Sequence, residues 1–559
     1  MRTIVTTILF FVFSVSVLCA QNDAVIFKAM KEEMERNRTQ LTMDKPDTPP
    51  ILFISYTLAD TRFVNASAAE GVILQTIVNP TERISSVRLI VGDNTFSSDY
   101  SYSGNGLMGT NYVTVEDNPS QIKAAFWVNS DVAYKFAVEA YNSKKSNIKN
   151  ANLTDEEKEL PEYIPMQAKE VIATHKSIPM GIERYEELAT KLSSEFGGEP
   201  SVVLSTVDVS GIETVYYYLS SEGVKSKQAV KYVDITLRAK VRLPSGQMVR
   251  EEKYMAFPDL DEMPDYKALR AEVQKFSEHL TAVRRAEKVD EYYLGPVLFE
   301  NEAVAKIFSD NLISLSGLLS FRKPIQVTAT VARAENISEM SRAKSLEERL
   351  GKKVLDSRLS VYNVTDLKKM NGLNLLGSYS VDAQGVAPKS RIPLIQNGIL
   401  TALLTQNVPT VKCKESTGSY RWGTKARSMI QEIAPGALLI EAPNGNTRAE
   451  LKEALITCAK EEGLEYGYIV RKLGASDQLL YRVSVKDGSE TLVINGELSP
   501  VPLAKLKRVL GVAKDQYVQN FIHKDAIPCA IVCPSGLLIE DVEVNVKRPS
   551  IQKDSRLIK

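Results

Sequence analysis

The sequence is poor in the side chains that most often bind metals. Its 559 residues include three histidines, which stand far apart at His175, His279 and His523. No His-Glu-x-x-His pattern or other short-spaced ligand pair occurs among them. The Gly-x-Ser-x-Gly elbow of serine hydrolases and the phosphate-binding loop of nucleotide hydrolases are also missing. The common sequence signatures of hydrolytic enzymes are therefore absent.

Neither charge sign is in excess, and long apolar runs are missing after the first 20 residues. Lys plus Arg and Asp plus Glu both number 69, so the chain has no electrostatic footprint for nucleic acid or an anionic membrane. No later apolar run reaches the roughly 18 residues that a membrane helix needs. We therefore expect no nucleic-acid partner and no stable membrane span once the first segment is removed.

Residues 1–20 have the features of a cleavable secretory signal peptide. Arg2 gives a positive start, residues 4–18 are almost entirely apolar, and the small Ala20 precedes Gln21. Fifteen residues at a rise of about 1.5 Å each are too short to cross a bilayer of roughly 30 Å. A retained anchor is the alternative. We expect an exported protein, either periplasmic or extracellular.

Cysteine is scarce, since cleavage would leave Cys413, Cys458, Cys529 and Cys533. Four cysteines in a chain of this length do not make a disulfide scaffold. Cys529 and Cys533 lie in one strand-like run, where four residues place them roughly 13 Å apart, beyond the roughly 7 Å Cα limit of a disulfide. They should not pair with each other, and buried free thiols are the simple alternative. Cys413 lies between two lysines that could lower its thiol pKa.

Hydrophobic periodicity predicts an α+β protein. The stretches with helical spacing are residues 23–41, 120–144, 163–175, 182–195, 265–288 and 448–462, together with a helix whose apolar face carries Val304, Ile307, Phe308 and Leu312. The β-like stretches are residues 51–57, 62–66, 71–78, 85–91, 201–209, 215–220, 232–243, 249–256 and 296–299. Short strands and tight turns dominate from residue 352. We place the main boundary between an N-terminal α/β region, 21–288, and a strand-rich C-terminal region, 289–559.

The strongest local turn signal is Asn397-Gly398, which joins two apolar runs. A two-residue Asn-Gly loop is typical of a hairpin whose central residues both have positive φ. Gly398→Val should therefore destabilise the fold by about 1 kcal/mol or more through backbone strain.

The order of three segments around this hairpin carries a family resemblance. Residues 380–386 form an Asp-acid-Glu-Gly-Val-like turn, the hairpin follows, and residues 416–421 form a Thr-Gly-Asn-x-Arg-like segment. In this order they resemble the C-terminal half of the TldD/PmbA family of metallopeptidases and their partner subunits. The resemblance is best from about residue 293 to 463. Upstream, residues 60–78 and 219–223 are similar to the family's opening strands and its Asn-Ser-Glu-Gly segment.

The chain departs from the family where the catalytic branch binds zinc. In that branch a Val-Leu-Leu strand leads into a helix with His-Glu-x-x-x-His. Here Val297-Leu298-Phe299 matches the strand, but Ser309 and Ser314 stand at the histidine positions and Asp310 at the glutamate. A catalytic zinc needs about three protein ligands and an open position, so Asp310 alone cannot hold one. Gln384 and Ser419 also replace the family's usual Glu and Asn.

The resemblance therefore implies the zinc-free, PmbA/TldE-like branch. Its expected function is that of a non-catalytic subunit in an exported peptidase complex acting on unfolded peptides, with zinc only in a catalytic partner. The expected partners are a TldD-like subunit with an intact His-Glu-x-x-x-His, or a second copy in a homodimer, and an extended peptide bound by strand addition. The candidate peptide-binding residues are Asp382, Gly385, Thr417, Gly418 and Arg421.

Two alternatives remain open from the sequence. One is a stand-alone envelope protein that binds peptides without a catalytic partner. The other is an active hydrolase with a site foreign to the family, using Cys413 or Asp310.

Overall fold

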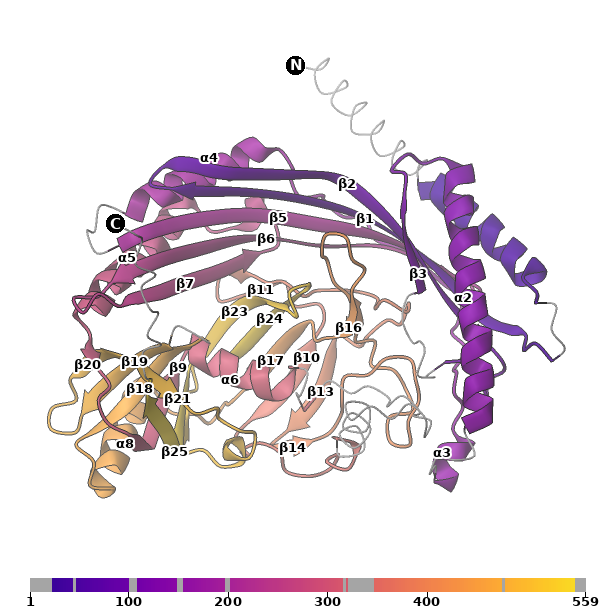
Figure 1. Ribbon diagram of the computed structural model, residues 1–559. Helices are drawn as coiled ribbons and strands as arrows, with labels where there is room; N and C mark the ends of the chain where they lie inside the picture. Colours follow the sequence, from indigo (N-terminus) through magenta and orange to yellow (C-terminus); the bar gives the residue numbers. More distant parts are fainter. Residues whose placement is uncertain are drawn as a thin grey trace, which may run out of the picture.

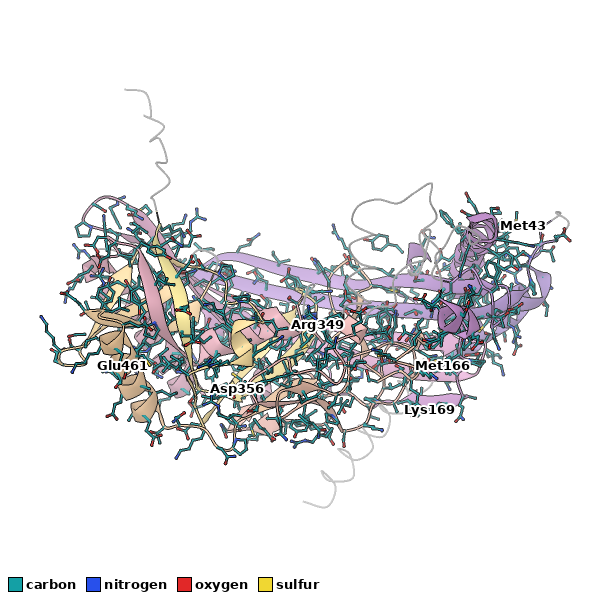
Figure 2. The ribbon with its side chains drawn as sticks, turned by 90° about the horizontal axis from the view of Figure 1, so that it is seen from below. Met43, Met166, Lys169, Arg349, Asp356 and Glu461 are labelled. Carbon is teal, nitrogen blue, oxygen red and sulfur yellow. The ribbon has the colours of Figure 1, made fainter. Side chains whose placement is uncertain are left out.

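The computed structural model describes residues 23–43, 47–99, 108–147, 154–196, 202–314, 318–319, 346–474 and 478–547. Figure 1 shows a long arched sheet from the N-terminal half above a strand-rich C-terminal part, which confirms the α+β fold class. Seen from below, the molecule is elongated, with Met43 near one end and Glu461 near the other (Figure 2). Within the described ranges, no helix is long and apolar enough to cross a membrane.

The arched sheet has the strand order β3-β2-β1-β5-β6-β4, and β7 pairs with β6. Its strands are β1 (Ile51–Ala69), β2 (Val72–Val91), β3 (Met108–Val113), β4 (Lys169–Ile172), β5 (Val202–Ser220), β6 (Val224–Arg242) and β7 (Met248–Phe257). A tight turn at Glu70-Gly71, with φ of 49° and 80°, joins β1 to β2. The two long hairpins, β1–β2 and β5–β6, lie side by side through the β1–β5 pairing and form the arch.

These strands are longer than the sequence pattern indicates. The four stretches expected within residues 51–91 form only β1 and β2. Pro80 lies at a register shift between Thr61 and Phe63, where a bulge accommodates a residue without an N–H group. In β5, the two predicted stretches continue through Gly211, where a Cβ would collide with the Tyr185 hydroxyl. Turn-favouring residues inside a strand thus mark bulges and close contacts here, not strand ends.

The described N-terminal half also contains several helices. They are the helix at residues 23–40, α2 (Pro119–Asn147), α3 (Asp155–Glu159), α4 (Ile182–Ser193), η2 (Ser194–Phe196), η3 (Leu260–Glu262) and α5 (Tyr266–Arg285). The helices predicted near residues 23–41, 120–144, 182–195 and 265–288 are confirmed. The apolar stripe predicted on α5 is buried.

The helix predicted at residues 163–175 is wrong, because this segment is extended and includes β4. Tyr163 donates a hydrogen bond from its hydroxyl to Glu222 at 2.7 Å, and the Met166 N–H donates to the same carboxylate at 2.9 Å. Lys169 to Ile172 then pair with β6 in parallel. These tertiary contacts override the local apolar spacing.

Alternation along the strands gives the arched sheet an outer and an inner face. On the outer face, Tyr56 belongs to a core shared with the helix at residues 23–40 and α2, and Val64 belongs to a core shared with α4 and α5. The inner face carries Ala59 and Tyr216, which pack against Trp422 of the C-terminal part. The two pairs of helices therefore cover opposite ends of one face, and the other face is turned to the C-terminal part (Figure 1).

The C-terminal part is built on two larger sheets of order β21-β25-β9-β18-β19-β20-β8, with β22 beside β25, and β14-β13-β10-β17-β24-β23. The strands are β8 (Glu287–Lys288), β9 (Tyr293–Glu300), β10 (Ser360–Val364), β11 (Lys369–Met370), β12 (Leu373–Asn374), β13 (Arg391–Gln396), β14 (Ile399–Leu400), β15 (Tyr420–Trp422), β16 (Gln431–Ile433), β17 (Ala437–Glu441), β18 (Tyr466–Leu473), β19 (Gln478–Ser484), β20 (Glu490–Ile494), β21 (Gly496–Leu498), β22 (Gly511–Val512), β23 (Gln516–His523), β24 (Ile527–Pro534) and β25 (Gly536–Val546). Its labelled helices are α6 (Glu302–Leu312), α8 (Arg448–Glu461) and η4 (Lys505–Lys507).

Helix α6 lies in the main core of the C-terminal part. Its residues Val304, Ile307, Phe308 and Leu312 are buried among side chains from both large sheets. This confirms the predicted apolar face of the helix that follows β9. The predicted helix at residues 448–462 is confirmed as α8, which begins with a capping box between Thr447 and Glu450.

The Asn397-Gly398 hairpin is confirmed between β13 and β14. The two residues have φ of 48° and 79°, as a two-residue hairpin loop requires. A Cβ on Gly398 would also collide with the Leu355 carbonyl oxygen and lie 2.9 Å from that of Asp356. Steric overlap therefore adds to the backbone strain expected for Gly398→Val. The strand after the turn is shorter than predicted, since β14 spans only Ile399–Leu400.

The C-terminal part contacts the inner face of the arch at its middle. Trp422 stacks on Tyr216 with ring centroids 4.2 Å apart. The Tyr216 hydroxyl donates to the Gly423 carbonyl at 2.6 Å, and the hydroxyls of Thr214 and Thr424 are 2.7 Å apart. A second contact joins Asn520 of β23 to the Ala256 carbonyl at 2.9 Å. These contacts place α6 and the β23–β24 hairpin below the end of the arch formed by β5, β6 and β7 (Figure 1).

Candidate site around α6

The three degenerate zinc-motif positions lie together at the end of α6. The Ser314 N–H donates to the Ser309 carbonyl at 3.1 Å, so these two positions are neighbours across the last turn. The Ser309 hydroxyl donates to the Lys306 carbonyl at 3.1 Å, and the Ser314 hydroxyl to the Asp310 carbonyl at 2.6 Å. Lys306 binds both Asp310 carboxylate oxygens, at 2.5 and 2.7 Å. All three polar side chains are thus engaged within α6 itself.

These positions line a cavity of about 470 Å³ between α6 and the β23–β24 hairpin. The lining residues are Glu302, Ala305, Lys306, Ser309, Asp310, Ile313, Ser314, Leu473, Gln519, Phe521, Ile522, His523, Lys524, Asp525 and Ile531. The fold brings His523, which the sequence leaves isolated, to the same cavity as Ser309 and Asp310. No short-range signal could have predicted this, because only the placement of β23 beside α6 joins the two segments.

The side chains in this cavity do not fit a catalytic zinc. Zinc in proteins takes His, Cys or carboxylate ligands in close tetrahedral contact. Among the described residues, no group of three or more His, Cys, Asp or Glu side chains is arranged to hold a metal ion. Asp310 is paired with a lysine, and serine is a weak ligand beside imidazole. Metal-assisted hydrolysis therefore has no support from the residues of α6.

The first of the predicted peptide-binding segments is a turn centred on a buried aspartate. Asp382 accepts hydrogen bonds from the N–H groups of Gln384 at 2.9 Å and Val386 at 2.8 Å. Its side chain is fully buried, and burial, which these N–H groups offset only in part, raises the pKa of Asp382 to about 7. Gly385 has φ of 90°, and a Cβ there would collide with Val224 of β6. The turn is therefore packed against the inner face of the arch.

The second predicted segment lies beside this turn, since the Ala383 N–H donates to the Tyr420 carbonyl at 2.7 Å. Thr417 accepts a hydrogen bond from the Thr405 N–H at 2.8 Å. Arg421 is buried, with its guanidinium 4.6 Å from the centre of the Tyr379 ring.

The rest of this segment is held in the same way. The Gly418 carbonyl accepts from the Tyr379 hydroxyl at 2.9 Å, and Arg421 donates to the Pro435 carbonyl. The structure brings the five candidates into one region, but their polar groups bind neighbouring protein groups. Contact with a peptide at these residues stays a prediction.

The lysines beside Cys413 do not activate its thiol. Burial and the nearby Glu347 carboxylate raise the pKa of Cys413 to about 11, against the smaller effect of Lys412. A nucleophilic cysteine needs the thiolate near neutral pH, so this thiol is not activated. In the described chain all four cysteines are free, and Cys529 and Cys533 are buried in β24 without bonding to each other, as predicted.

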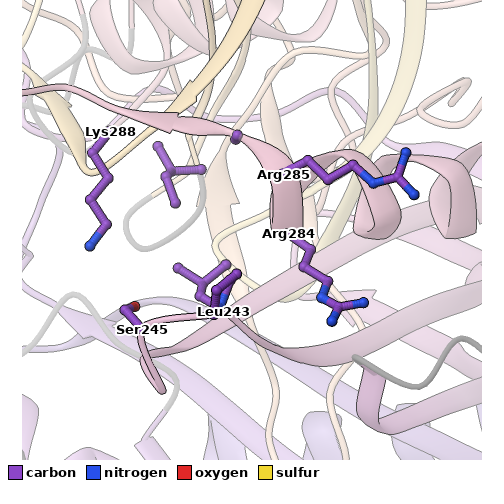
Figure 3. A pocket seen from close by; sticks show the side chains of 8 residues that line it. Leu243, Ser245, Arg284, Arg285 and Lys288 are labelled. Atoms are coloured by element: carbon purple, nitrogen blue, oxygen red, sulfur yellow. The ribbon is translucent and has the colours of Figure 1, made fainter.

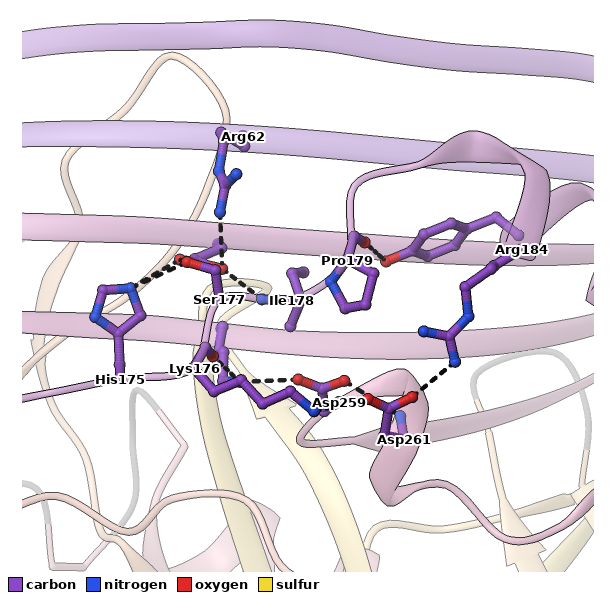
Figure 4. A network of polar contacts seen from close by, with 12 residues as sticks. Arg62, His175, Lys176, Ser177, Ile178, Pro179, Arg184, Asp259 and Asp261 are labelled. Atoms are coloured by element: carbon purple, nitrogen blue, oxygen red, sulfur yellow. Dashed lines mark hydrogen bonds and ion pairs between the residues drawn. The ribbon is translucent and has the colours of Figure 1, made fainter. Parts of the chain in front are cut away.

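A cluster of Glu, His and Ser side chains, the residue types of a serine hydrolase, lies on the outer face of the arch (Figure 4). Glu213 of β5 is fully buried, and its carboxylate accepts from Ser177 at 3.0 Å and from the Ile178 N–H at 2.8 Å. His175 Nε2 lies 3.0 Å from it, and Arg62 forms an ion pair with it at 3.2 Å. Burial alone would raise the pKa of Glu213, but these hydrogen bonds and the Arg62 charge leave it below its ordinary value.

This cluster does not have the geometry of a serine-hydrolase triad. In a triad the acid binds one imidazole nitrogen and the serine the other. Here Ser177 and Glu213 both approach Nε2 of His175, at 3.4 and 3.0 Å. Glu213 instead holds the segment at residues 175–178 onto the sheet. The sequence signal that was overlooked is a glutamate in the short gap between the two strand-like stretches that form β5.

A second overlooked carboxyl lies on the inner face. Asp234 of β6 is partly accessible, and burial, only partly offset by a hydrogen bond from Ser210, raises its pKa to about 7. Tyr232 and Tyr254 lie on the same face; burial raises their pKa values, and the charges of Asp234 and Asp525 add smaller contributions. Asp525 also lines the α6 cavity. The alternation of apolar and polar residues along β6 could have placed Asp234 on this face from the sequence. It could not have identified the residues that lie near Asp234 in the fold.

A separate cavity of about 530 Å³ lies between the β6–β7 turn and the end of α5 (Figure 3). Its labelled cationic residues do not converge, because Arg284 and Arg285 point away from Lys288. Basic residues in the last turn of a helix also complement its dipole. This cavity therefore gives no argument for an anion site.

Comparisons with known proteins agree with this architecture. A family model for the PmbA/TldA metallopeptidase C-terminal domain matches residues 294–545. Among curated proteins, no significant match was found. The fold is similar to TldE from Thermococcus kodakarensis, with 15% identity, 92% of this chain and 99% of that chain covered, and a TM-score of 0.55.

Two further solved structures share the fold, and both are proposed modulators of DNA gyrase. The protein from Thermotoga maritima MSB8 is 14% identical, with 88% of this chain and 96% of that chain covered and a TM-score of 0.55. The protein from Bacteroides thetaiotaomicron VPI-5482 is 12% identical, with 94% and 99% covered and a TM-score of 0.56. The match of residues 294–545 to this C-terminal domain, together with the shared fold, supports the assignment of this chain to the PmbA/TldD family.

Proposed function

We propose that this protein is an exported, non-catalytic member of the PmbA/TldD family that encloses unfolded peptide for a catalytic partner. The partner would be a family member with an intact His-Glu-x-x-x-His motif, carrying the zinc and the hydrolytic chemistry. Extended peptide would bind in the space near α6, beneath the inner face of the arch. The chain would then contribute shape and binding, and the partner the bond cleavage.

The single observation that carries this proposal is the end of α6. The helix follows β9 as the family resemblance leads one to expect, yet it presents Ser309, Asp310 and Ser314. Their polar groups are engaged by α6 itself and by Lys306. A helix whose last turn satisfies its own side chains has no ligand set to offer a metal. The cavity next to it is nevertheless present, with a volume of about 470 Å³.

Peptide binding is supported by the polar character of that cavity. Lys306, Lys524 and Gln519 can donate hydrogen bonds, and Asp525 and Glu302 can accept them. Donors and acceptors of both kinds suit a peptide backbone, which presents N–H and carbonyl groups in alternation. Such contacts would recognise unfolded chains with little dependence on their side chains.

The direct test is reconstitution. The mature protein is mixed with an exported family member that carries His-Glu-x-x-x-His, and cleavage of an unfolded substrate such as reduced, carboxymethylated casein is followed. We expect cleavage by the mixture only, and its loss when the partner's motif histidines are replaced by alanine. Cleavage by this chain alone would overturn the proposal, and so would the absence of any complex between the two proteins.

A variant of this chain tests whether the α6 cavity is the binding region. Ser309→Trp should fill the cavity and weaken binding of a fluorescent unfolded peptide about tenfold or more, which corresponds to at least 1.4 kcal/mol. Thr457→Trp, at an exposed position on α8, is the matched control and should leave binding unchanged. Peptide binding without any partner-dependent cleavage would instead favour the stand-alone peptide-binding protein.

A further inference from the structure

Two carboxyl groups and two tyrosines gather where the inner face of the arch meets the β23–β24 hairpin. Tyr232 and Asp234 stand on either side of the buried Val233 along β6, so both lie on the inner face. Tyr254 lies on the same face of β7, the strand that pairs with β6. Asp525 belongs to the turn of the hairpin, and its charge acts on both tyrosine hydroxyls. Figure 1 shows β6 and β7 above this hairpin, which a contact between β23 and β7 holds in place.

This group of side chains is desolvated but remains open to solvent. Tyr254 is 37% exposed, and Tyr232 and Asp234 are partly exposed. Burial nevertheless raises the pKa values of all three, that of Asp234 to about 7. Side chains that are desolvated and still accessible line a recess, since protein surrounds them without covering them. Because Asp525 also lines the α6 cavity, the group lies beside the space proposed for peptide.

The basic side chains beside this group already have carboxylate partners. Arg238 of β6 binds two carboxylates, those of Asp208 and, at 2.8 Å, Glu252. Lys524, in the turn of the hairpin, forms an ion pair with Glu432 at 2.6 Å. Among the described residues, neither aspartate of the group forms an ion pair. A carboxylate that is removed from water without a cation is unfavourable, so the group can accept a positive charge from outside the chain.

We propose that this group binds a positively charged group of the enclosed peptide, either a Lys or Arg side chain or the N-terminal ammonium. We call it the Asp234 site, made of Tyr232, Asp234, Tyr254 and Asp525. The two carboxylates supply the opposite charge and accept charge-assisted hydrogen bonds, and the tyrosine rings attract the cation through their faces. The inference rests on the proposed function, since the peptide brings the cation. It adds a preference for basic over neutral peptides.

The composition of the Asp234 site suits an organic cation better than a metal ion. Calcium and magnesium take about six or more oxygen ligands at short distances. In the part of the chain that the structure describes, no group of three or more His, Cys, Asp or Glu side chains is arranged to bind a metal. An ammonium or guanidinium group needs only one or two carboxylates and also gains from aromatic rings. A bound cation stabilises the ionised form of Asp234, which burial disfavours.

The first test compares unstructured Gly-Ser peptides that differ only in charge, each with the same fluorophore at an amidated C-terminus. One is N-acetylated with a central lysine, the second is N-acetylated with norleucine instead, and the third has norleucine and a free N-terminus. Fluorescence anisotropy with the purified mature protein gives each Kd. We expect the first or the third peptide to bind about tenfold or more tightly than the second, and the one that gains identifies the cation. Equal, measurable affinities for all three would overturn this inference alone, whereas no binding of any peptide would overturn the proposed function with it.

The second test locates the preference within the chain. Asp234→Asn should remove it, so that charged and neutral peptides bind alike, whereas Glu461→Gln, at an exposed position on α8 outside the site, should keep it. Tyr254→Leu should reduce the preference about threefold, and Tyr254→Phe should restore it, because the ring face is retained. A preference that survives Asp234→Asn, or that Glu461→Gln removes equally, would overturn the proposal. A loss in Tyr254→Phe equal to that in Tyr254→Leu would contradict contact between the cation and the ring.

Discussion

The Glu213 cluster and the end of α6 each suggest catalysis for a different reason. Glu213, His175 and Ser177 are the residue types of a hydrolase, yet their geometry makes the carboxylate an anchor for the segment at residues 175–178. The end of α6 is the place where the family resemblance locates catalysis, yet it carries serines bonded to their own helix. Residue types suggest catalysis at the Glu213 cluster, and sequence position suggests it at the end of α6. The side-chain contacts support catalysis in neither region.

The difference between these two regions shows what burial and hydrogen bonds do to a carboxyl group. Glu213 is buried with enough donors to stay ionised, so it is costly to remove. Asp310 is exposed and binds only Lys306, so it contributes little to stability. Functional assignment therefore has to rest on which atoms a side chain contacts.

The largest effect is expected from Glu213→Gln. This change leaves Arg62 and His175 without their charged partner next to a buried position. Breaking a buried ion pair costs about 3–5 kcal/mol, and Arg62, which is 34% exposed, places the loss near the lower limit. Urea unfolding monitored by circular dichroism measures it. A loss below about 1 kcal/mol would mean that Glu213 is not the anchor.

The dependence of the free energy of unfolding on pH also tests whether Glu213 is the anchor. Because the pKa of Glu213 is lowered in the folded protein, its contribution is complete above its unfolded value, near 4.5, and is lost as the pH falls through the folded value. The wild type should therefore lose more stability below pH about 4.5 than Glu213→Gln does. Parallel stability curves for the two proteins in acid would contradict this account.

A smaller effect is expected at His175. His175→Ala removes a hydrogen bond to the buried carboxylate, which is worth about 1.5 kcal/mol because the imidazole is partly exposed. Thermal unfolding should show this loss, and Ser177→Ala should show a similar or smaller one. Neither variant should change any ester or peptide hydrolysis by the purified chain. A drop in such activity would make the cluster catalytic and reverse the comparison.

A weaker effect of the opposite pH dependence is expected at Asp234, whose carboxyl keeps some contact with solvent. Its pKa is raised to about 7, so its folded form favours the proton, and stability falls as the pH rises from about 4 to about 7. Asp234→Asn should remove that fall. The measurement is the free energy of unfolding of the wild type and of Asp234→Asn at pH 4, 5.5 and 7.5. Equal changes with pH in the two proteins would contradict the raised pKa of Asp234.

The smallest effect is expected at α6. Asp310→Ala removes one exposed ion pair and should change the free energy of unfolding by no more than about 0.5 kcal/mol. Thermal unfolding of this variant and of Ser309→Ala measures it. A loss as large as that of Glu213→Gln would mean that α6 has a structural role that its contacts do not show.

Sequence reasoning was most successful where local periodicity decides structure. The apolar stripe of α5, the helix after β9 and the Asn397-Gly398 turn are all present, because each depends on spacing or φ within one segment. It failed at residues 163–175, where Glu222 and the edge of β6 hold an extended chain. The sequence also left the state of Cys413 open, because burial and the distant Glu347 carboxylate, which raise its thiol pKa, outweigh the neighbouring Lys412.

The candidate site was predicted only in part. Ser309, Asp310 and Ser314 could be located through the strand and helix that precede them. His523, Asp525 and Asp234 could not, because they reach the same region from the β23–β24 hairpin and from β6 by tertiary folding. No spacing in the sequence relates such segments.

The most direct test of the central claim is metal analysis of the purified mature protein. After gentle purification without chelators and equilibration with a slight excess of zinc followed by gel filtration, inductively coupled plasma mass spectrometry gives the zinc content per chain. A zinc-free subunit should retain far less than one zinc per chain, and Ser309→Ala should not change that value. Stoichiometric, tightly bound zinc in the wild type that is lost when Asp310 or His523 is replaced would contradict the account.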